Sequence, residues 1–392
     1  MKINNLMIDG VGGIRNLELS FNDGFNVICG ANGVGKTTIL NTVADAFSDS
    51  GELLKRNSMV AEGKYCIDYF DITGKEVVKE YEVKEFDPLT CDHSRYGTDT
   101  SSFVMSFGIN RIINYRELNA IPKDAPRSKY DAARLLNKGV GIDDLKGWFV
   151  NRFLFADKPN SITDEQKYNF EIATKAFGLL DETTTFYTVD SGSLDIKLSS
   201  NRGEIYFEYL SAGYKTCVYL VLGIIKEIEF RFKEPYIKVD EFDGVILIDE
   251  IDLHLHPTWQ ARLVNTLKEL FPKTQFIVTT HSPSVLQTLS PEEIIPLGID
   301  EEGNVFRKDL SLGQYGLQGW TIEEILHDIM DMPETTSKIF KKVKSDFDAA
   351  MDAEDKINIK KNYDILQEML HWDNPLKKLL EIQMIGMEES NE

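Results

Sequence analysis

Cysteine is scarce in this chain of 392 residues, which contains only four. They lie far apart and form no Cys-x-x-Cys pair, which argues against both a cysteine zinc site and a disulfide framework. The four are Cys29, Cys66, Cys91 and Cys217. Because such sparing use of cysteine is typical of a reducing compartment, we expect a cytoplasmic protein.

Long apolar runs and excess positive charge are also missing. No stretch of 18 uninterrupted apolar residues occurs, and residues 1–5 are not followed by the apolar core of a signal peptide, so we expect no membrane partner. Lysine and arginine number 43 against 64 acidic residues, which gives a formal net charge of −21. The average field therefore repels nucleic acid, and any DNA contact would be local or made through a complex.

The most informative stretch present is residues 30–38, Gly-Ala-Asn-Gly-Val-Gly-Lys-Thr-Thr. It fits the phosphate-loop pattern G-x-x-x-x-G-K-[ST] at every defined position, between an apolar run at residues 25–29 and helically spaced apolar residues at 39–47. We expect Lys36 to reach the β- and γ-phosphates of ATP and the Thr37 hydroxyl to bind Mg²⁺. The predicted nucleotide-binding residues of this loop are Asn32, Gly33, Val34, Gly35, Lys36, Thr37 and Thr38.

Two further apolar runs end in polar residues suited to hydrolysis. Residues 245–250, Val-Ile-Leu-Ile-Asp-Glu, predict a buried strand after which Asp249 holds Mg²⁺ and Glu250 polarises the attacking water. Residues 275–281 predict a second buried strand, ending at His281 on the face where open parallel sheets bind ligands. The predicted catalytic residues are therefore Glu250, His281 and Lys36, and the predicted metal ligands are Thr37 and Asp249.

Two polar clusters allow more than one interpretation. His254 and His256 could belong to a metal site, but apart from Asp252 nothing completes a recognised ligand spacing, so packing in a turn or between subunits is favoured. A basic cluster near residue 125 is either a local nucleic-acid surface or a solvated loop. Its members are Lys123, Arg127, Lys129 and Arg134.

The order of these segments predicts an α/β protein with a mixed sheet, flanking helices, a helical insertion and an all-helical C-terminal region. We place the phosphate-loop lobe at residues 1–114, the insertion at 115–185 and a second lobe at 186–310. Strands are expected at 186–189, 194–198 and 204–209. Residues 311–392 are expected to be helical and to serve oligomerisation or partner docking.

The ordered motifs resemble those of the ABC-type ATPase head found in double-strand-break repair ATPases, RecF and structural-maintenance-of-chromosomes (SMC) proteins. These motifs are residues 30–38, 210–213, 245–250 and 279–283. Two of them read Leu-Ser-Ala-Gly-Tyr-Lys and Thr-Thr-His-Ser-Pro. These sequences are similar to the corresponding motifs of soluble prokaryotic AAA-type ATPases. That group includes overcoming-lysogenization-defect nucleases and the PtuA subunits of Septu and retron-associated antiphage systems.

The resemblance implies roles for several residues. Asp249 and Glu250 would form the Walker B pair and His281 would be the switch histidine. Ser211 and Gly213, which alone could be an ordinary helix cap and turn residue, would contact the γ-phosphate bound to another subunit. ATP would then hold together a homodimer or a higher homo-oligomer.

The resemblance also implies a partner effector. The chain has neither the clustered acidic residues of a Toprim nuclease nor an HNH histidine constellation, so a separate HNH nuclease of the PtuB kind is the expected partner. A RecF-like or break-repair ATPase that binds DNA directly is the alternative, and a transporter ATPase is less favoured. The Q-loop glutamine of ABC heads has no clear equivalent, because Gln166 lies in an expected helix; Arg111 is a candidate for that position.

Overall fold

A computed structural model describes residues 1–90, 92–94, 97–111, 115–141 and 144–389. Cys91 and Asp143, where one helix was expected to begin, lie outside these ranges. The chain divides into two compact units, Met1–Asp331 and Met332–Glu392, which are described separately below. The four-part division along the sequence remains a prediction.

The first unit is built around a six-stranded mixed sheet of order β15-β14-β3-β13-β12-β8. β14, β3, β13, β12 and β8 run parallel, and β15 pairs antiparallel with β14 at one edge. The strands are β3 (Phe25–Gly30), β8 (Val104–Phe107), β12 (Val245–Ile248), β13 (Gln275–Thr279), β14 (Ile294–Ile299) and β15 (Val305–Arg307). Every residue of β3, β12 and β13 is buried, as expected for parallel strands covered on both faces.

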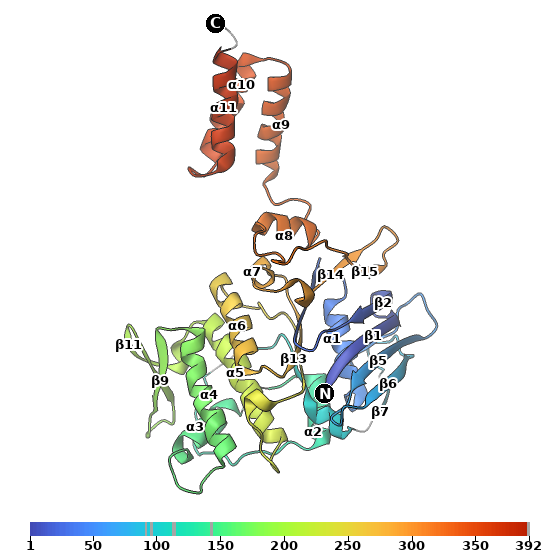
Figure 1. Cartoon of the computed structure of the whole chain (residues 1–392), viewed down its shortest axis with the longest axis vertical. Helices are drawn as coiled ribbons and strands as arrows, with labels where there is room; N and C mark the ends of the chain where they lie inside the picture. The colour runs from blue at the N-terminus through green and yellow to red at the C-terminus, as the bar shows by residue number, and fades with distance from the viewer. Residues whose placement is uncertain (91, 95–96, 112–114, 142–143, 390–392) are drawn as a thin grey trace. The chain divides into compact units, whose positions relative to one another are not determined.

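Successive residues of these strands enter two different hydrophobic cores. Val27 and Ile246 pack on one face with four helices, whereas Ile28 and Leu247 pack on the other face with α1 (Lys36–Asp45) and an antiparallel sheet. The four helices are α3 (Leu145–Phe155), α4 (Asp164–Leu180), α5 (Ala212–Arg231) and α6 (Pro257–Leu270). This alternation follows from the two-residue period of a strand. Figure 1 shows α4, α5 and α6 on one side of β13, and α1 with the antiparallel sheet on the other.

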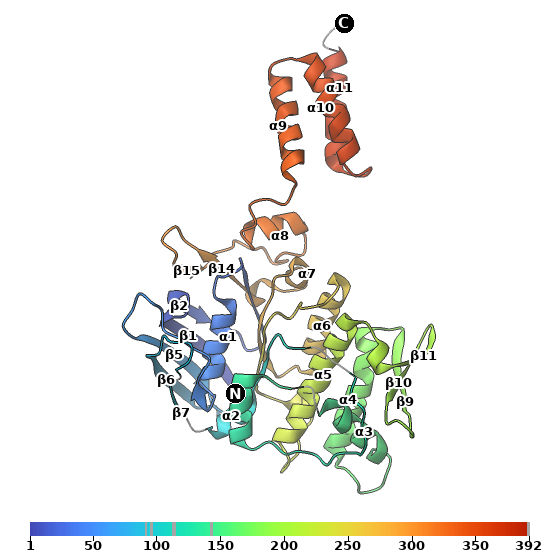
Figure 2. The ribbon, with the colours of Figure 1, turned by 180° about the vertical axis from the view of Figure 1, so that it is seen from behind.

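The antiparallel sheet has the order β2-β1-β5-β6. Its strands are β1 (Lys2–Val11), β2 (Ile14–Ser20), β5 (Gly63–Phe70) and β6 (Glu76–Val83). A smaller sheet joins β9 (Thr184–Val189), β10 (Ile196–Ser200) and β11 (Gly203–Tyr206) and lies beside α3 and α4 in both views (Figure 2). β4 (Ser50–Gly51) pairs with β7 (Asp92–Ser94).

Most helices of the first unit begin at residues that the sequence marks as caps. Ser128, Thr163 and Thr321 form capping boxes at the starts of α2, α4 and α8. The helices are α1 (Lys36–Asp45), α2 (Lys129–Lys138), α3 (Leu145–Phe155), α4 (Asp164–Leu180), α5 (Ala212–Arg231), α6 (Pro257–Leu270), α7 (Pro283–Leu286) and α8 (Ile322–Asp328). Short 3₁₀ helices occupy Asp99–Phe103, Phe207–Tyr209, Val239–Glu241 and Pro291–Glu293.

The second unit is a bundle of three helices, α9 (Lys338–Asp352), α10 (Lys356–Met369) and α11 (Pro375–Glu389). It has a small core of its own, centred on Phe347, Ile359, Leu366 and Leu380. Together the two units confirm the predicted α/β class with a mixed sheet, flanking helices and a helical C-terminal region. In the described part of the chain, no helix has the length and apolar character needed to cross a membrane.

Candidate nucleotide site

The phosphate loop joins the end of β3 to the start of α1, as the sequence predicts for such a motif. Gly30, Gly33 and Gly35 have φ angles of +140°, +80° and +97°, values that L-residues with a side chain rarely adopt. Gly30 also lacks space, because a Cβ there would lie 2.5 Å from the carbonyl oxygen of Leu297. The loop therefore presents backbone N–H groups and the N-terminus of α1, an arrangement suited to phosphate.

Lys36 is folded into this loop. Its Nζ donates hydrogen bonds to the carbonyl oxygens of Gly30 at 2.9 Å and Ala31 at 2.7 Å. Burial lowers the pKa of the Lys36 ammonium, because the charged form loses solvation. The two carbonyl groups compensate the positive charge of Lys36 only in part. A bound phosphate would supply the negative charge that is missing.

The other predicted residues of the loop differ in exposure. Asn32, Gly33 and Thr37 are exposed, Gly35 and Thr38 are half-buried, and Val34 is fully buried in the core with α1. We infer that Val34 anchors the loop, whereas Asn32 and Gly33 remain accessible. Thr38 lies beneath the β1–β2 turn, where a Cβ on Gly12 would be 3.0 Å from its Cγ2.

Thr37 and Asp249, 212 positions apart in sequence, meet at the carboxyl end of the sheet. The Thr37 hydroxyl donates to the Asp249 carboxylate, with separations of 3.2 Å to Oδ1 and 3.1 Å to Oδ2. Thr279 at the end of β13 donates a further hydrogen bond to Asp249 Oδ1 at 2.6 Å. Hydroxyl and carboxylate oxygens are the ligands that Mg²⁺ prefers, so this pair fits the predicted ion.

Glu250 has an unusual backbone conformation next to this pair. Its φ is +49°, in the left-handed region that non-glycine residues seldom occupy. Its N–H donates to Thr279 Oγ1 at 2.7 Å, so one threonine orients both Asp249 and the backbone of Glu250. The sequence identified the two carboxylates but not the threonine that joins them, although its place at the end of a buried strand was a usable signal.

His281 follows β13 and is half-buried. Burial lowers the pKa of its imidazole, and the positive charge of Lys36 lowers it further. The side chain is therefore neutral at pH 7, a form that can both donate and accept a hydrogen bond. The influence of Lys36 indicates that the loop after β13 shares the electrostatic environment of the phosphate loop.

Two side chains tie the loops after β12 and β13 together. Asp252 Oδ1 accepts hydrogen bonds from the Thr280 hydroxyl at 2.6 Å and from the His281 N–H at 3.2 Å. Gln260 of α6 is buried; its Nε2 donates to the Leu255 carbonyl, and its Oε1 accepts from the Ser282 hydroxyl. No sequence motif gives Gln260 a role, because nothing in its local pattern distinguishes it from an ordinary helical residue.

Ser211 and Gly213 lie at the start of α5. The Ser211 hydroxyl accepts a hydrogen bond from the Tyr214 N–H at 3.3 Å, and a Cβ on Gly213 would lie 3.0 Å from the His254 carbonyl oxygen. Among the described residues, neither forms a hydrogen bond with the phosphate loop of the same chain. Their proposed role toward a nucleotide therefore depends on a second subunit.

Arg111 and Gln166, the two residues considered for the Q-loop, have very different surroundings. Gln166 caps α4, where its Oε1 accepts from the Thr163 N–H at 3.1 Å. Arg111 is only 2% exposed and donates to the carbonyl oxygens of Asp249 and Glu250. Of the two, only Arg111 contacts the carboxylate segment.

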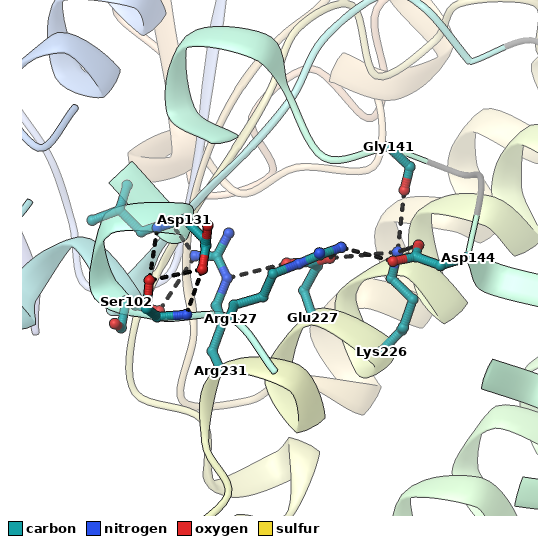
Figure 3. A network of polar contacts seen from close by, with 10 residues as sticks. Ser102, Arg127, Asp131, Gly141, Asp144, Lys226, Glu227 and Arg231 are labelled. Atoms are coloured by element: carbon teal, nitrogen blue, oxygen red, sulfur yellow. Dashed lines mark hydrogen bonds and ion pairs between the residues drawn. The ribbon is translucent and has the colours of Figure 1, made fainter. Parts of the chain in front are cut away.

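The two ambiguous clusters receive structural explanations. His256 caps α6 through Nδ1, and no group of three potential metal ligands occurs in the part of the chain that the structure describes. Three members of the basic cluster are engaged in ion pairs: Arg127 with Asp144 and Glu227 (Figure 3), Lys129 with Asp99, and Arg134 with Asp49. These contacts favour a structural role for most of that cluster.

Comparisons with known proteins identify the family of the chain. Residues 5–204 match a family described as an AAA domain, and residues 155–287 match one described as "AAA domain, putative AbiEii toxin, Type IV TA system". A Septu protein PtuA of Bacillus thuringiensis is 43% identical over 97% of both chains. A retron Vc95 probable ATPase of Vibrio cholerae is 43% identical over 26% of this chain and 20% of its own length.

An SMC head domain from Thermotoga maritima has a TM-score of 0.45 at 15% identity, and the match covers 79% of this chain and 100% of that domain. The family assignment follows from the sequence relatives, above all from the match along nearly the whole of both chains. The chain belongs to the Septu PtuA family of AAA-domain ATPases.

Proposed function

We propose that this protein binds and hydrolyses ATP with Mg²⁺, and that ATP joins two copies of the chain head to tail. The observation that carries the proposal is the contact of the Thr37 hydroxyl with the Asp249 carboxylate at the end of a complete phosphate loop. Lys36 and the loop amides would bind the phosphates, while Thr37 and Asp249 would hold the ion. Bound Mg²⁺ would neutralise charge on the β- and γ-phosphates.

Glu250 is proposed as the general base that accepts a proton from the attacking water. His281, which burial keeps neutral, would donate a hydrogen bond to the γ-phosphate. Among the described residues, Ser211 and Gly213 form no hydrogen bond with the phosphate loop of their own chain, so we place them at the nucleotide of the other copy. Each of the two sites would then contain residues from both subunits.

We further propose that the ATP-bound assembly regulates a partner effector, an HNH nuclease of the PtuB kind, in antiphage defence. This rests on membership of the PtuA family and on the sequence, which carries no HNH constellation of its own. We place partner docking or oligomerisation on the C-terminal helices. A DNA-stimulated ATPase activity that disappears at high salt would instead favour the RecF-like alternative.

The test is the mass in solution of the wild type and of Glu250→Gln, each with and without ATP and Mg²⁺. Removing the base should slow hydrolysis and trap the nucleotide-bound assembly, so we expect an ATP-dependent increase in mass that is larger in the variant. Lys36→Ala is the control, because it should abolish phosphate binding and with it the increase. An ATP-dependent increase that persists in Lys36→Ala would contradict the proposal, as would an unchanged mass in all samples.

A further inference from the structure

The environment of Arg111 is unusual for an arginine. The residue is only 2% exposed, and no carboxylate of the described residues forms an ion pair with it. Burial lowers the pKa of its guanidinium, yet an arginine remains charged at neutral pH. A buried charge is costly unless it is compensated; the carboxylates of Asp249, Asp252 and Glu250 favour the charged form only through space, without an ion pair.

The compensation comes from three backbone carbonyl groups. Nε donates to the Gly108 oxygen at 2.9 Å, Nη1 donates to the Glu250 oxygen at 3.1 Å, and Nη2 donates to the Asp249 oxygen. All three nitrogens of the guanidinium are therefore used, and their planar geometry fixes the relative positions of the acceptors. The side chain thus joins the loop after β8 to the segment that follows β12.

Two of those carbonyls belong to the peptide groups on either side of the Glu250 Cα atom. Holding both at once restricts rotation about φ and ψ of Glu250, whose φ of +49° is unfavourable for a glutamate. Such a conformation is strained and persists only where the surroundings impose it. The N–H of Glu250 is held independently by Thr279 Oγ1 at 2.7 Å.

We propose that Arg111 is a positioning residue for catalysis: it holds the backbone of Glu250 in the left-handed conformation that directs the general base. Arg111 would act through Glu250 and not on the nucleotide itself. The inference rests on the proposed function, because it takes Glu250 as the base. It goes further than a likeness to the Q-loop position, because it assigns to Arg111 a role exerted through the backbone of Glu250.

The primary test compares Arg111→Lys and Arg111→Gln with the wild type in steady-state hydrolysis and in ATP binding. We expect kcat to fall by about 10- to 100-fold, because misplacing a catalytic group by about 1 Å has an effect of that size. The Kd for ATP should change by less than about threefold, since the hydrogen bonds of Arg111 to described residues go to Gly108, Asp249 and Glu250 and none goes to the phosphate loop. Arg56→Lys is the matched control, because Arg56 also donates to three backbone carbonyls, those of Lys84, Asn57 and Val60.

Two further measurements separate positioning from a general loss of structure. In ATP-free protein, hydrogen exchange at the amides of residues 249–251 should become faster in the Arg111 variants, with little change in the thermal midpoint. In the Glu250→Gln background, Arg111→Lys should have no additional effect on hydrolysis, because the group that it positions is already gone.

The outcomes are distinct. Unchanged kcat and unchanged exchange at residues 249–251 would overturn the inference, as would equal losses of ATP affinity and kcat. If the wild type hydrolyses no ATP, the proposed function fails while the exchange measurement still decides whether Arg111 holds this segment. If one variant fails to fold, the other substitution provides the same comparison, and failure of both with Arg56→Lys intact would assign Arg111 a purely structural role.

Discussion

At the scale of single residues, His281 offers a test that needs no nucleotide. Burial lowers its pKa in the folded protein below the value of about 6.5 of an unfolded chain. As the pH falls through that value, the unfolded state takes up a proton before the folded state does, so stability is lost. We expect the wild type to lose more free energy of unfolding between pH 7.5 and 5.5 than His281→Gln, measured by urea denaturation. Equal losses of unfolding free energy in the two proteins would contradict the lowered pKa of His281.

The sequence predicted the residues of the site more completely than their connections. Lys36, Thr37 and Asp249 belong to motifs whose spacing reflects phosphate and Mg²⁺ chemistry, and the structure brings Thr37 and Asp249 into contact. Thr279 at the end of β13 and Arg111 in the loop after β8 support the same carboxylate segment. Their roles depend on which strands are neighbours in the sheet, and no local sequence pattern predicts that order.

At the scale of secondary-structure elements, two glycines of the phosphate loop should respond differently to alanine. Gly30 ends β3 against the Leu297 carbonyl of β14, whereas no atom lies within 4 Å of a Cβ built on Gly33. We expect Gly33→Ala to cost about 1–2 kcal/mol, from left-handed strain alone. Gly30→Ala should cost about 3 kcal/mol, because overpacking is added. Thermal unfolding of the two variants checks this order, and equal midpoints would refute it.

The ion network on α5 is a second prediction at this scale. Glu227 is fully buried and lies between Lys226, Arg127 and Arg231 (Figure 3). Burial alone would raise its pKa, but the surrounding cations outweigh that effect and lower it. Glu227→Gln would remove a counter-charge from the buried Lys226 and Arg231 and the half-buried Arg127, so we expect a loss of about 3 kcal/mol in the free energy of unfolding.

A matched exposed pair provides the control for that substitution. Oε2 of Glu82, an exposed residue of β6, lies 2.6 Å from Nζ of Lys84, which follows the strand. Glu82→Gln should cause no measurable change, because solvent screens exposed pairs. Chemical denaturation of both variants measures the difference. A Glu227→Gln variant as stable as the wild type would mean that the network contributes no net stability.

Element boundaries show where sequence patterns lose resolution. The expected strand at 204–209 ends at Tyr206, and residues 207–209 form a 3₁₀ turn before Ser211 caps α5. Phe207 continues the alternation of apolar and polar residues beyond β11. Its side chain is buried in the core, although it lies past the last paired residue of the strand. Tyr209, two residues further on, is 74% exposed, so the alternation matched the burial of Phe207 but neither the exposure of Tyr209 nor the end of the sheet.

At the scale of the whole molecule, the two units suggest where the chain can be cut. The C-terminal region was expected to begin near residue 311, yet α8 belongs to the first unit, where Ile325 and Ile329 are fully buried in the main core. A truncation at Trp320 would expose that core. A truncation after Asp331 removes only the three-helix bundle, which has a separate core.

We therefore expect residues 1–331 to fold and bind ATP with wild-type affinity, and to lose either partner binding or the larger assembly. Calorimetric ATP binding, together with mass measurement in solution, tests both parts. If the truncated protein keeps its ATP affinity, its partner binding and the mass of its assembly, the proposed role of the C-terminal helices is wrong. Loss of ATP affinity would show that the two units depend on each other.

The hydrogen bonds of Asp252 and Gln260 join the loops after β12 and β13 to each other. The His254 carbonyl of the first loop also lies beside Gly213. In the proposed pair, the loop that senses a nucleotide in one subunit would be joined to the residues that contact the nucleotide of the other. The two sites would then not bind ATP independently of each other. Occupation of the first would alter the affinity of the second, and the protein would respond to ATP over a narrow concentration range, as a cooperative switch does.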